Sequence, residues 1–142
     1  MARKKTAKKK KVSIVARGKR KEAVARASIC EGTGNVRINS VSLEAYQSRY
    51  VKAIISEPLH LAADISPKVD ISVSVRGGGA MGQAQAARLA IARALVEYSK
   101  DETLKDKMYE RDKFLVAEDS RRVEPKKYMG PKARARKQKS YR

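Results

Sequence analysis

Residues 69–75 read Val-Asp-Ile-Ser-Val-Ser-Val, an alternation of apolar and polar side chains that predicts a β-strand with one buried face. Residues 77–79 are three glycines. Residues 80–100 are rich in Ala, Leu, Ile and Arg and contain no proline, which predicts a helix. One face of this helix consists of Ala84, Ala87, Ile91, Leu95 and Tyr98. We therefore expect the helix to cover a sheet through a closely packed alanine stripe.

Three further runs have β character, at residues 12–16, 23–30 and 36–39. Residues 31–35 contain two glycines and predict a turn, so we expect an antiparallel hairpin between the second and third of these runs. With residues 69–75, the pattern gives four strands.

Helical spacing appears on both sides of the 69–75 strand. Residues 43–50 are expected to form a short helix after an N-cap at Ser42, and the spacing continues through Ile55 until Pro58 interrupts it. Residues 102–109 predict a further short helix. The chain therefore mixes strands and helices in one body.

Positive charge is concentrated at the two ends of the chain. The 142 residues allow one compact domain with extensions, and the formal net charge is +19. Residues 1–11 hold seven basic and no acidic side chains, and residues 120–142 hold ten basic side chains and one acid, Glu124. We therefore predict a basic N-terminal arm (1–11), a nearly neutral globular body (12–119) and an extended basic C-terminal tail (120–142).

The predicted tail has little apolar surface to bury. Its large apolar side chains are Val123, Tyr128, Met129 and Tyr141. Their burial cannot offset about 1–2 kcal/mol of backbone ordering entropy per residue, so the tail alone should be disordered and a polyanion should order it. A solvated solubility tail is the alternative, but like charge this dense is typical of an arm that binds nucleic acid.

Composition argues against membrane, secretory and catalytic roles. No run approaches the roughly 20 apolar residues of a membrane span, and the apolar run after the basic N-terminus is too short for a signal peptide, so we expect a cytoplasmic protein without a membrane partner. Cys30 is the one cysteine and reads as a buried small hydrophobe. His60 is the one histidine and is expected to be half-buried rather than a general base. We expect no enzyme activity, catalytic residue, cofactor or metal site.

Residues 77–82, Gly-Gly-Gly-Ala-Met-Gly, match the pattern G-x-G-x-x-G between a predicted strand and a predicted helix. A dinucleotide site would need a second parallel strand ending in an acidic residue about 20 residues on, where this helix still continues. Two other interpretations stay open. The glycine turn and the helix N-terminus can present N–H groups to an RNA phosphate, beside Arg76, Gln83 and Arg88. A tight turn without a ligand explains the glycines equally well.

Four cations lie within five residues in Arg17-Gly18-Lys19-Arg20-Lys21, which we place in a loop between two strands. A solvated loop is the simplest interpretation of this stretch alone. With two basic arms on the same chain, a loop that contacts phosphates is favoured, because such contacts need no base-specific geometry.

Four stretches together point to one family: Gly18-Lys19-Arg20-Lys21-Glu22-Ala23-Val24-Ala25-Arg26, Gly32-Thr33-Gly34-Asn35-Val36, Arg76-Gly77-Gly78-Gly79 with Gly82-Gln83-Ala84, and Gln138-Lys139-Ser140-Tyr141-Arg142. In this order they resemble the small-subunit ribosomal protein nine family, from about Val12 to Arg142. The last two stretches are similar to the archaeal branch. The chain departs from the family pattern at Met129 and Lys132, where glycine is expected, and at Lys137, where an aromatic residue is expected.

The resemblance implies an α+β fold of the ribosomal S-five domain-two-like type, a mixed four-stranded sheet with helices packed on one side. It implies a place in the head of the small ribosomal subunit, with small-subunit rRNA, neighbouring head proteins and peptidyl-site tRNA as partners and no homo-oligomer. The tail is expected to thread through rRNA, and its tip to contact the tRNA. Two other functions stay open: a nucleotide-binding enzyme that uses Gly77 to Gly82, and a protein that binds any nucleic acid through charge.

The residues expected to contact rRNA are basic, glycine or glutamine residues of the body and the tail. They are Lys19, Arg20, Lys21, Arg26, Arg76, Gly77, Gly78, Gly79, Gln83, Arg88, Arg121, Arg122, Lys126, Lys127, Lys132, Arg134, Arg136 and Lys137. Those expected at the tRNA are Lys139, Ser140, Tyr141 and Arg142.

Overall fold

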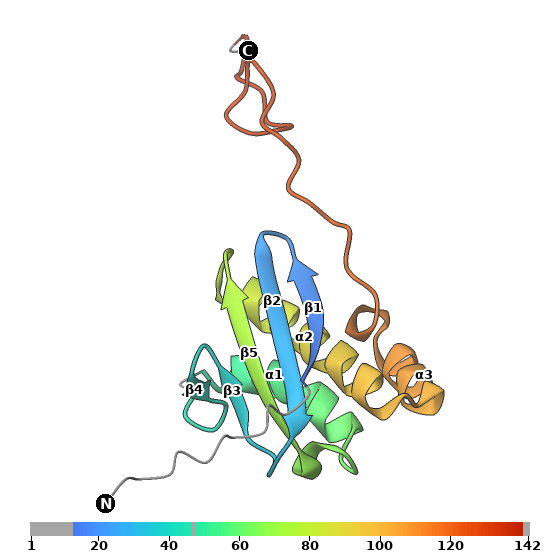
Figure 1. Cartoon of the computed structure of the whole chain (residues 1–142). Helices are drawn as coiled ribbons and strands as arrows, with labels where there is room; N and C mark the ends of the chain where they lie inside the picture. The colour runs from blue at the N-terminus through green and yellow to red at the C-terminus, as the bar shows by residue number, and fades with distance from the viewer. Residues whose placement is uncertain (1–12, 47, 141–142) are drawn as a thin grey trace, which may run out of the picture.

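A mixed sheet with helices on one face forms the body of the protein (Figure 1). The structure is a computed structural model, and it describes residues 13–46 and 48–140. The predicted α+β fold with helices packed on one side is confirmed. The sheet has five strands rather than the predicted four, because the chain turns back after the third strand and residues 41–42 pair with it. The predicted arm at residues 1–11 lies outside the described residues.

The strands lie in the order β1-β2-β5-β3-β4. Strands β1 (Ile14–Arg20), β2 (Ala23–Glu31) and β5 (Val69–Arg76) form an antiparallel centre. Strand β3 (Val36–Ile38) runs parallel to β5, and β4 (Val41–Ser42) pairs antiparallel with β3. The sheet is therefore mixed through a single parallel pair.

The predicted hairpin between residues 23–30 and 36–39 is wrong. Strand β2 forms its hairpin with β1, and β5 lies between β2 and β3. Asp70 of β5 holds the turn that crosses from β2 to β3, because its Oδ1 accepts the backbone N–H groups of Thr33 at 2.9 Å and Asn35 at 3.0 Å. The long strand β5 gives β2 eight partner residues, whereas β3 is only three residues long.

The first helix, α1 (Arg49–Leu61), begins and ends later than predicted. Ser48 rather than Ser42 is the N-cap, and its Oγ accepts the N–H of Val51 at 3.5 Å. Pro58 lies inside the helix instead of ending it, and its side chain is fully buried. Proline removes one backbone hydrogen bond from a helix, and here the burial of its ring offsets that loss.

Helix α2 (Ala80–Ser99) lies at the centre of the body, in agreement with the predicted helix over residues 80–100. Ala84, Ala87, Ile91 and Leu95 are buried as expected, whereas Tyr98 is half-buried. Further buried alanines, at positions 86, 90, 92 and 94, show that α2 is enclosed on most of its surface.

Gly18 of β1 explains how closely α2 approaches the sheet. A Cβ atom at this position would lie 2.2 Å from the carbonyl oxygen of Ala86 and 2.7 Å from the backbone nitrogen of Ala90. The helix backbone therefore occupies the space that any other side chain would need. The expected alanine stripe is present, and a glycine on the facing strand completes it.

Helix α3 (Glu102–Arg111) and the short 3₁₀ helices η1 (Ser66–Lys68) and η2 (Lys113–Leu115) complete the body. Leu104, Met108 and Leu115 bury their side chains in the core that α1 and α2 share. Among the described residues, no helix is both long enough and apolar enough to cross a bilayer.

The two faces of the sheet differ in character. Residues such as Ala25, Ile29 and Val73 point toward α1 and α2 and are buried, whereas the residues between them along each strand are exposed or half-buried. In Figure 1 the two helices lie behind the sheet, and no helix or strand of the described residues covers the nearer face. We call this uncovered side, formed by the outward residues of β1, β2, β5 and β3, the open face.

Candidate nucleic-acid interface

The three consecutive cations Lys19, Arg20 and Lys21 do not form the predicted loop. Strand β1 extends through Arg20, and the turn into β2 consists of Lys21 and Glu22. Lys21 adopts a positive φ of 53° at this turn and is exposed. Because side chains alternate along a strand, Lys19 lies on the open face whereas Arg20 points toward α2. The structure therefore separates three cations that the sequence groups together.

The glycine turn lies against the β1–β2 turn at the same end of the sheet. Gly77 and Gly78 have φ values of 77° and 66°, which side-chain-bearing residues rarely adopt. A Cβ on Gly77 would lie 2.6 Å from the carbonyl oxygen of Glu22, and one on Gly78 would lie 3.1 Å from Ala23. The turn therefore requires glycine at both positions whether or not a ligand binds there.

Gly79 and Gln83 complete the entry into α2. Gly79 is the N-cap and provides no side-chain hydrogen bond to the helix, and a Cβ added to it would meet nothing within 4 Å. The side chain of Gln83 turns back, and its Nε2 donates to the carbonyl oxygen of Gly77 at 3.1 Å. The first turn of α2 contains no acidic residue, so nothing in it opposes an anion.

The dinucleotide interpretation of Gly77 to Gly82 fails on topology. Helix α2 is followed by α3 rather than by a parallel strand, so no strand end carries an acidic residue to a ribose. A cavity of about 130 Å³ near the side of α2 is lined by Gln85, Arg88 and Asp119. A second cavity of about 420 Å³, lined by Ile38, Ala80 and Gln83, lies at the start of α2, so the topology and not the cavity size argues against a dinucleotide.

Arg26 and Arg76 both lie on the open face with exposed side chains, as phosphate contacts require. Arg88 has a different environment. Its guanidinium lies 2.7 Å from Glu57 and 2.7 Å from Asp112, and its side chain is 13% exposed. Arg88 ties α2 to α1 and to the residue after α3, so we leave it out of the proposed RNA contacts.

Asp112 forms the second ion pair of Arg88 and also caps η2. Its Oδ1 accepts the N–H of Phe114 at 2.9 Å. Burial alone would raise the pKa of Asp112, but the hydrogen bonds from the Phe114 N–H and from Arg88 outweigh it, so the pKa lies below its ordinary value. The carboxylate is therefore held in its charged form.

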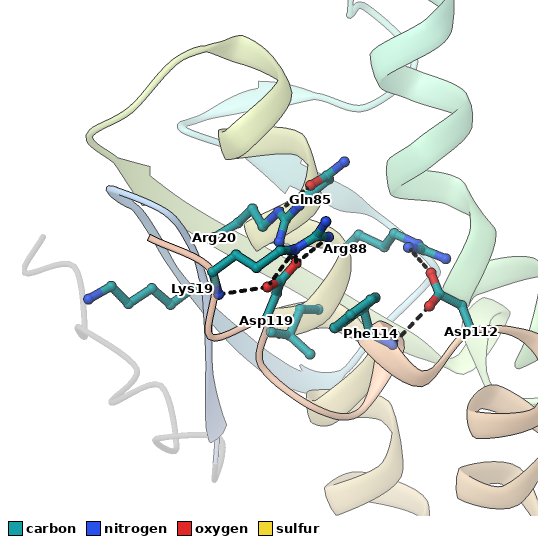
Figure 2. Close-up of a pocket in the computed structure, with 9 residues that line it drawn as sticks. Lys19, Arg20, Gln85, Arg88, Asp112, Phe114 and Asp119 are labelled. Atoms are coloured by element: carbon teal, nitrogen blue, oxygen red, sulfur yellow. Dashed lines mark hydrogen bonds and ion pairs between the residues drawn. The ribbon is translucent and has the colours of Figure 1, made fainter. Parts of the chain in front are cut away.

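A buried carboxylate marks the place where the tail leaves the body. Asp119 is 5% exposed and forms ion pairs with Arg20 and with Arg121, whose Nη2 lies 2.6 Å away. Figure 2 shows Arg20 and Asp119 pointing toward each other, while Lys19 points away. The Arg20 Nε also donates to Gln85 of α2 at 2.7 Å. Arg20 therefore joins the sheet, the central helix and the start of the tail.

The cations around this cluster affect one another. Burial and, to a smaller extent, the nearby charges of Arg121 and Arg122 lower the pKa of Arg20, and its guanidinium stays protonated because arginine is the most basic side chain. The guanidinium of Arg121 also lies over the ring of Phe114, 5.7 Å from its centroid. Arg121 is thus partly engaged within the protein, whereas its exposed side leaves it available to a partner.

The tail after this point contains neither helix nor strand in the described residues and extends away from the body (Figure 1). Its cations Lys126, Lys132, Lys137 and Lys139 are exposed. The direction of the tail is that of the sheet end where the β1–β2 turn and the glycine turn lie. Among the described residues, the cations of the two turns and of the tail therefore lie toward one end of the sheet.

The outer part of the tail curls around its one acid. Glu124 accepts hydrogen bonds from Arg134 at 2.9 Å and Lys127 at 2.9 Å, and these bonds lower its pKa. Arg136 donates to the carbonyl oxygen of Tyr128 at 3.0 Å. These exposed contacts are weak, so a polyanion can replace them at little cost.

Met129 adopts a φ of 65° within this curl, a conformation that favours glycine. The resemblance implies glycine at that position, and the backbone forms the left-handed turn although methionine stands there. At the tip, Gln138 donates to the carbonyl oxygen of Ser140 at 2.8 Å, and Lys139 is exposed. Tyr141 and Arg142 lie outside the described residues.

Cys30 and His60 contribute nothing to an active site. Cys30 is half-buried rather than buried, carries a free thiol and lies on the open face. His60 is exposed near the end of α1, so its predicted half-burial is wrong. Within the described residues, no group of His, Cys, Asp and Glu side chains is arranged to hold a metal ion.

Two comparisons with known proteins agree with this geometry. The sequence pattern of the family described as ribosomal protein S9/S16 matches residues 18–142. The chain belongs to the ribosomal protein S9/S16 family. Over 125 residues it is 46% identical to the small ribosomal subunit protein uS9 of Methanothrix thermoacetophila. The aligned region covers 88% of this chain and 95% of that protein.

Membership of the S9/S16 family confirms the resemblance to small-subunit ribosomal protein nine, including its archaeal character. A ribosomal protein is a structural component of the ribosome, so the expectation that the chain is not an enzyme is also confirmed. The nucleotide-binding enzyme is thereby set aside on both family and topology.

The residues expected to contact rRNA do not include Arg37, nor Arg17, which the sequence placed in the phosphate-contacting loop. Both lie on the open face, and both side chains are exposed. Arg17 belongs to β1 rather than to a loop, and the signal for this is the alternation Val15, Arg17, Lys19, which continues the strand period. The ion pair of Arg20 with Asp119 could not be predicted, because the two residues are 99 positions apart in the sequence.

Proposed function

We propose that the chain is an rRNA-binding structural protein of the small ribosomal subunit, whose tail threads between rRNA segments. The exposed tail supports this most strongly. Between residues 120 and 140, nine basic side chains accompany the single acid Glu124, and the segment leaves the body without regular structure. Such a segment is stabilised by a polyanion and by little else.

The body and the tail have different tasks in this proposal. Many charges of the body are already paired inside the protein, as Arg88 and Arg111 are with Glu57. Lys21 at the β1–β2 turn, Arg26 and Arg76 are among the cations left exposed, and these three hold rRNA phosphates near the glycine turn. The body thus fixes the position of the protein, and Arg122, Lys126 and the later tail cations neutralise RNA around the tail.

The tip of the tail, Lys139 to Arg142, contacts the tRNA in the peptidyl site. This follows from the family resemblance and from the reach of the chain. Sixteen residues after Lys126 span at most about 53–58 Å when fully extended, which is far beyond the body. Neighbouring proteins of the subunit head complete the set of partners, and the protein acts as a single copy.

The experiment that tests the proposal compares the full chain with a chain ending at Asp119. Each is titrated with small-subunit rRNA and with scrambled RNA of equal length over a range of salt concentrations. We expect the full chain to prefer rRNA, and we expect removal of the tail to flatten the plot of log K against log salt. The slope should change by about 0.7–0.9 for each phosphate that the shortened chain no longer neutralises.

Two results would contradict the proposal. Equal affinity for the two RNAs at every salt concentration would indicate a protein that binds nucleic acid through charge alone. An unchanged salt slope after removal of the tail would show that the tail does not contact RNA.

A further inference from the structure

The open face carries arginine side chains that the strand register aligns in rows. Lys19 and Arg76 share one row across β1, β2 and β5, and Arg17 lies directly beside Arg26 in the next row. Arg37 of β3 lies one row further along. Neighbouring strands are about 4.8 Å apart and alternate residues about 6.8 Å apart, so these cations cover one continuous area of the sheet.

The four arginines of this area have no partner among the described residues. Arg17, Arg26, Arg37 and Arg76 are exposed, and their side chains form neither an ion pair nor a hydrogen bond with the part of the chain that the structure describes. Asp70 is the carboxylate of the face, and it lies at the opposite end, where it holds the turn at residues 32–35. The open face is thus positive from its middle to the glycine turn.

The pairing of Arg17 with Arg26 is unfavourable in the free protein. Like charges directly opposite each other on two strands destabilise a sheet. Arg88 and Arg93, by contrast, each have carboxylate partners elsewhere in the same body. A cationic pair without such a partner is expected where an external anion supplies the opposite charge.

The chemistry of the face favours a phosphate backbone over bases or a protein partner. Its outward residues are Val15, Arg17, Lys19, Val24, Arg26, Ser28, Cys30, Arg37, Asp70, Ser72, Ser74 and Arg76. None is aromatic, so the face offers no stacking platform for bases. Arginine and serine side chains donate hydrogen bonds to phosphate oxygens, and arginine does so with two N–H groups at once.

From these observations we infer that the open face lies on the phosphate backbone of an RNA segment, held by Arg17, Arg26, Arg37 and Arg76. This inference rests on the proposed rRNA-binding function and assigns it a second surface besides the tail. Arg26 and Arg76 thus bind the same RNA segment as Arg17 and Arg37. The uncovered side of the sheet is then an interface rather than a solvent-facing surface.

The test replaces Arg17 and Arg26 in the full chain, Arg17→Gln with Arg26→Gln, and measures binding to full-length small-subunit rRNA at several salt concentrations. We expect weaker binding and a plot of log K against log salt that is flatter by about 1.4–1.8, because two fewer phosphates are neutralised. The control is Lys105→Gln with Lys107→Gln, which removes the same charge from exposed positions of α3. The control should leave the slope unchanged.

A stability measurement distinguishes weaker RNA binding from impaired folding. Because the double substitution removes two like charges that face each other, the urea midpoint of the Arg17 and Arg26 variant should equal or exceed that of the parent chain. Weaker RNA binding by an equally stable protein supports the inference. A lower midpoint would show that the two side chains stabilise the fold, and it would contradict the assignment of an unpartnered pair.

Two further outcomes would overturn the inference. If the double variant keeps the parent's affinity and slope while removal of residues 120–142 flattens the slope, the open face does not contact RNA, and the proposed function stands without it. If the double variant binds free rRNA normally but fails to enter subunits assembled with their other proteins, the face docks on a protein. Failure of the proposed function itself would appear as no preference of the parent chain for rRNA.

Discussion

At the scale of single residues, Gly18 allows the central helix to pack closely on the sheet. We predict that Gly18→Ala destabilises the protein by about 1–3 kcal/mol, because its Cβ would meet backbone atoms of Ala86 and Ala90 at 2.2 and 2.7 Å. Urea unfolding measures the change. The matched control is Gly79→Ser, at a glycine with open space around it and at an N-cap position that suits serine. Equal stability of both variants would contradict this explanation of the packing.

Asp119 is the second residue on which the body depends. Asp119→Asn should lower the free energy of unfolding by about 3 kcal/mol, since it leaves the guanidinium of Arg20 buried without its carboxylate. Glu124→Gln is the control, because the ion pairs of Glu124 are exposed and should not affect unfolding of the body. Chemical denaturation of the two variants decides the question. If Asp119→Asn has no effect, the cluster at the start of the tail does not contribute to stability.

Asp112 should make stability depend on pH in the acid range. Its pKa is lower in the folded protein than in the unfolded chain, so it stabilises the fold above the ordinary aspartate pKa of about 3.9 and loses this effect as the pH falls through the folded value. Asp112→Asn should therefore cost about 1 kcal/mol at pH 7, and the difference from the parent should shrink below pH 4. Urea titrations at pH 7, 5 and 3 test this. A difference that stays constant with pH would contradict the assignment.

At the scale of elements, an asparagine side chain extends the pairing of β3 with β5. Asn39 accepts the N–H of Val75 at 2.8 Å and donates to its carbonyl oxygen at 3.1 Å, so it acts as one more strand residue. We predict that Asn39→Gly, which tolerates the φ of 47°, costs about 2 kcal/mol and accelerates hydrogen exchange at Val75. Ser40→Gly is the control, at a φ of 72°, and should be neutral or stabilising. Unchanged exchange at Val75 would exclude the role of Asn39.

The sequence could predict which segments form elements better than how they pair. Residues 69–75 and 80–100 have clear periods, and both elements agree with the structure within one residue at each end. The predicted partner of β2 is wrong. A turn that contains glycines can join β2 to β3 whether the two strands pair directly or β5 lies between them, and the sequence pattern is the same in both cases. The predicted start of α1 is wrong because Ser42 and Ser48 are both acceptable caps, and tertiary packing selects between them.

At the scale of the whole molecule, the division of charge into ends and body could be read from the sequence, because it needs only counting. The direction in which each cationic side chain points could not be predicted from the sequence. All four of Arg20, Arg26, Arg76 and Arg88 were expected to contact rRNA. The fold instead pairs Arg20 and Arg88 with carboxylates and leaves Arg26 and Arg76 exposed. Only the alternation along β1 and the position of Asp119 and Asp112 in space distinguish them.

Three cationic segments of the described chain lie toward one end of the sheet. The β1–β2 turn, the glycine turn and the tail lie toward the same end of the sheet, and the open face leads to it. A single folded RNA can therefore contact the open face and surround the tail together. This arrangement fits the proposed function, in which the body positions the protein and the tail carries its tip to a second RNA.

The most direct test of the proposed function uses small subunits that contain the chain truncated after Gln138, which removes the proposed tRNA contacts and keeps the rest of the tail. The particles should assemble with the truncated protein in full amount, and peptidyl-site tRNA should bind about tenfold more weakly, the equivalent of one charge-assisted hydrogen bond of about 1.4 kcal/mol. Particles that fail to incorporate the truncated chain, or that incorporate it and retain tRNA with unchanged affinity, would contradict the division of tasks between body, tail and tip.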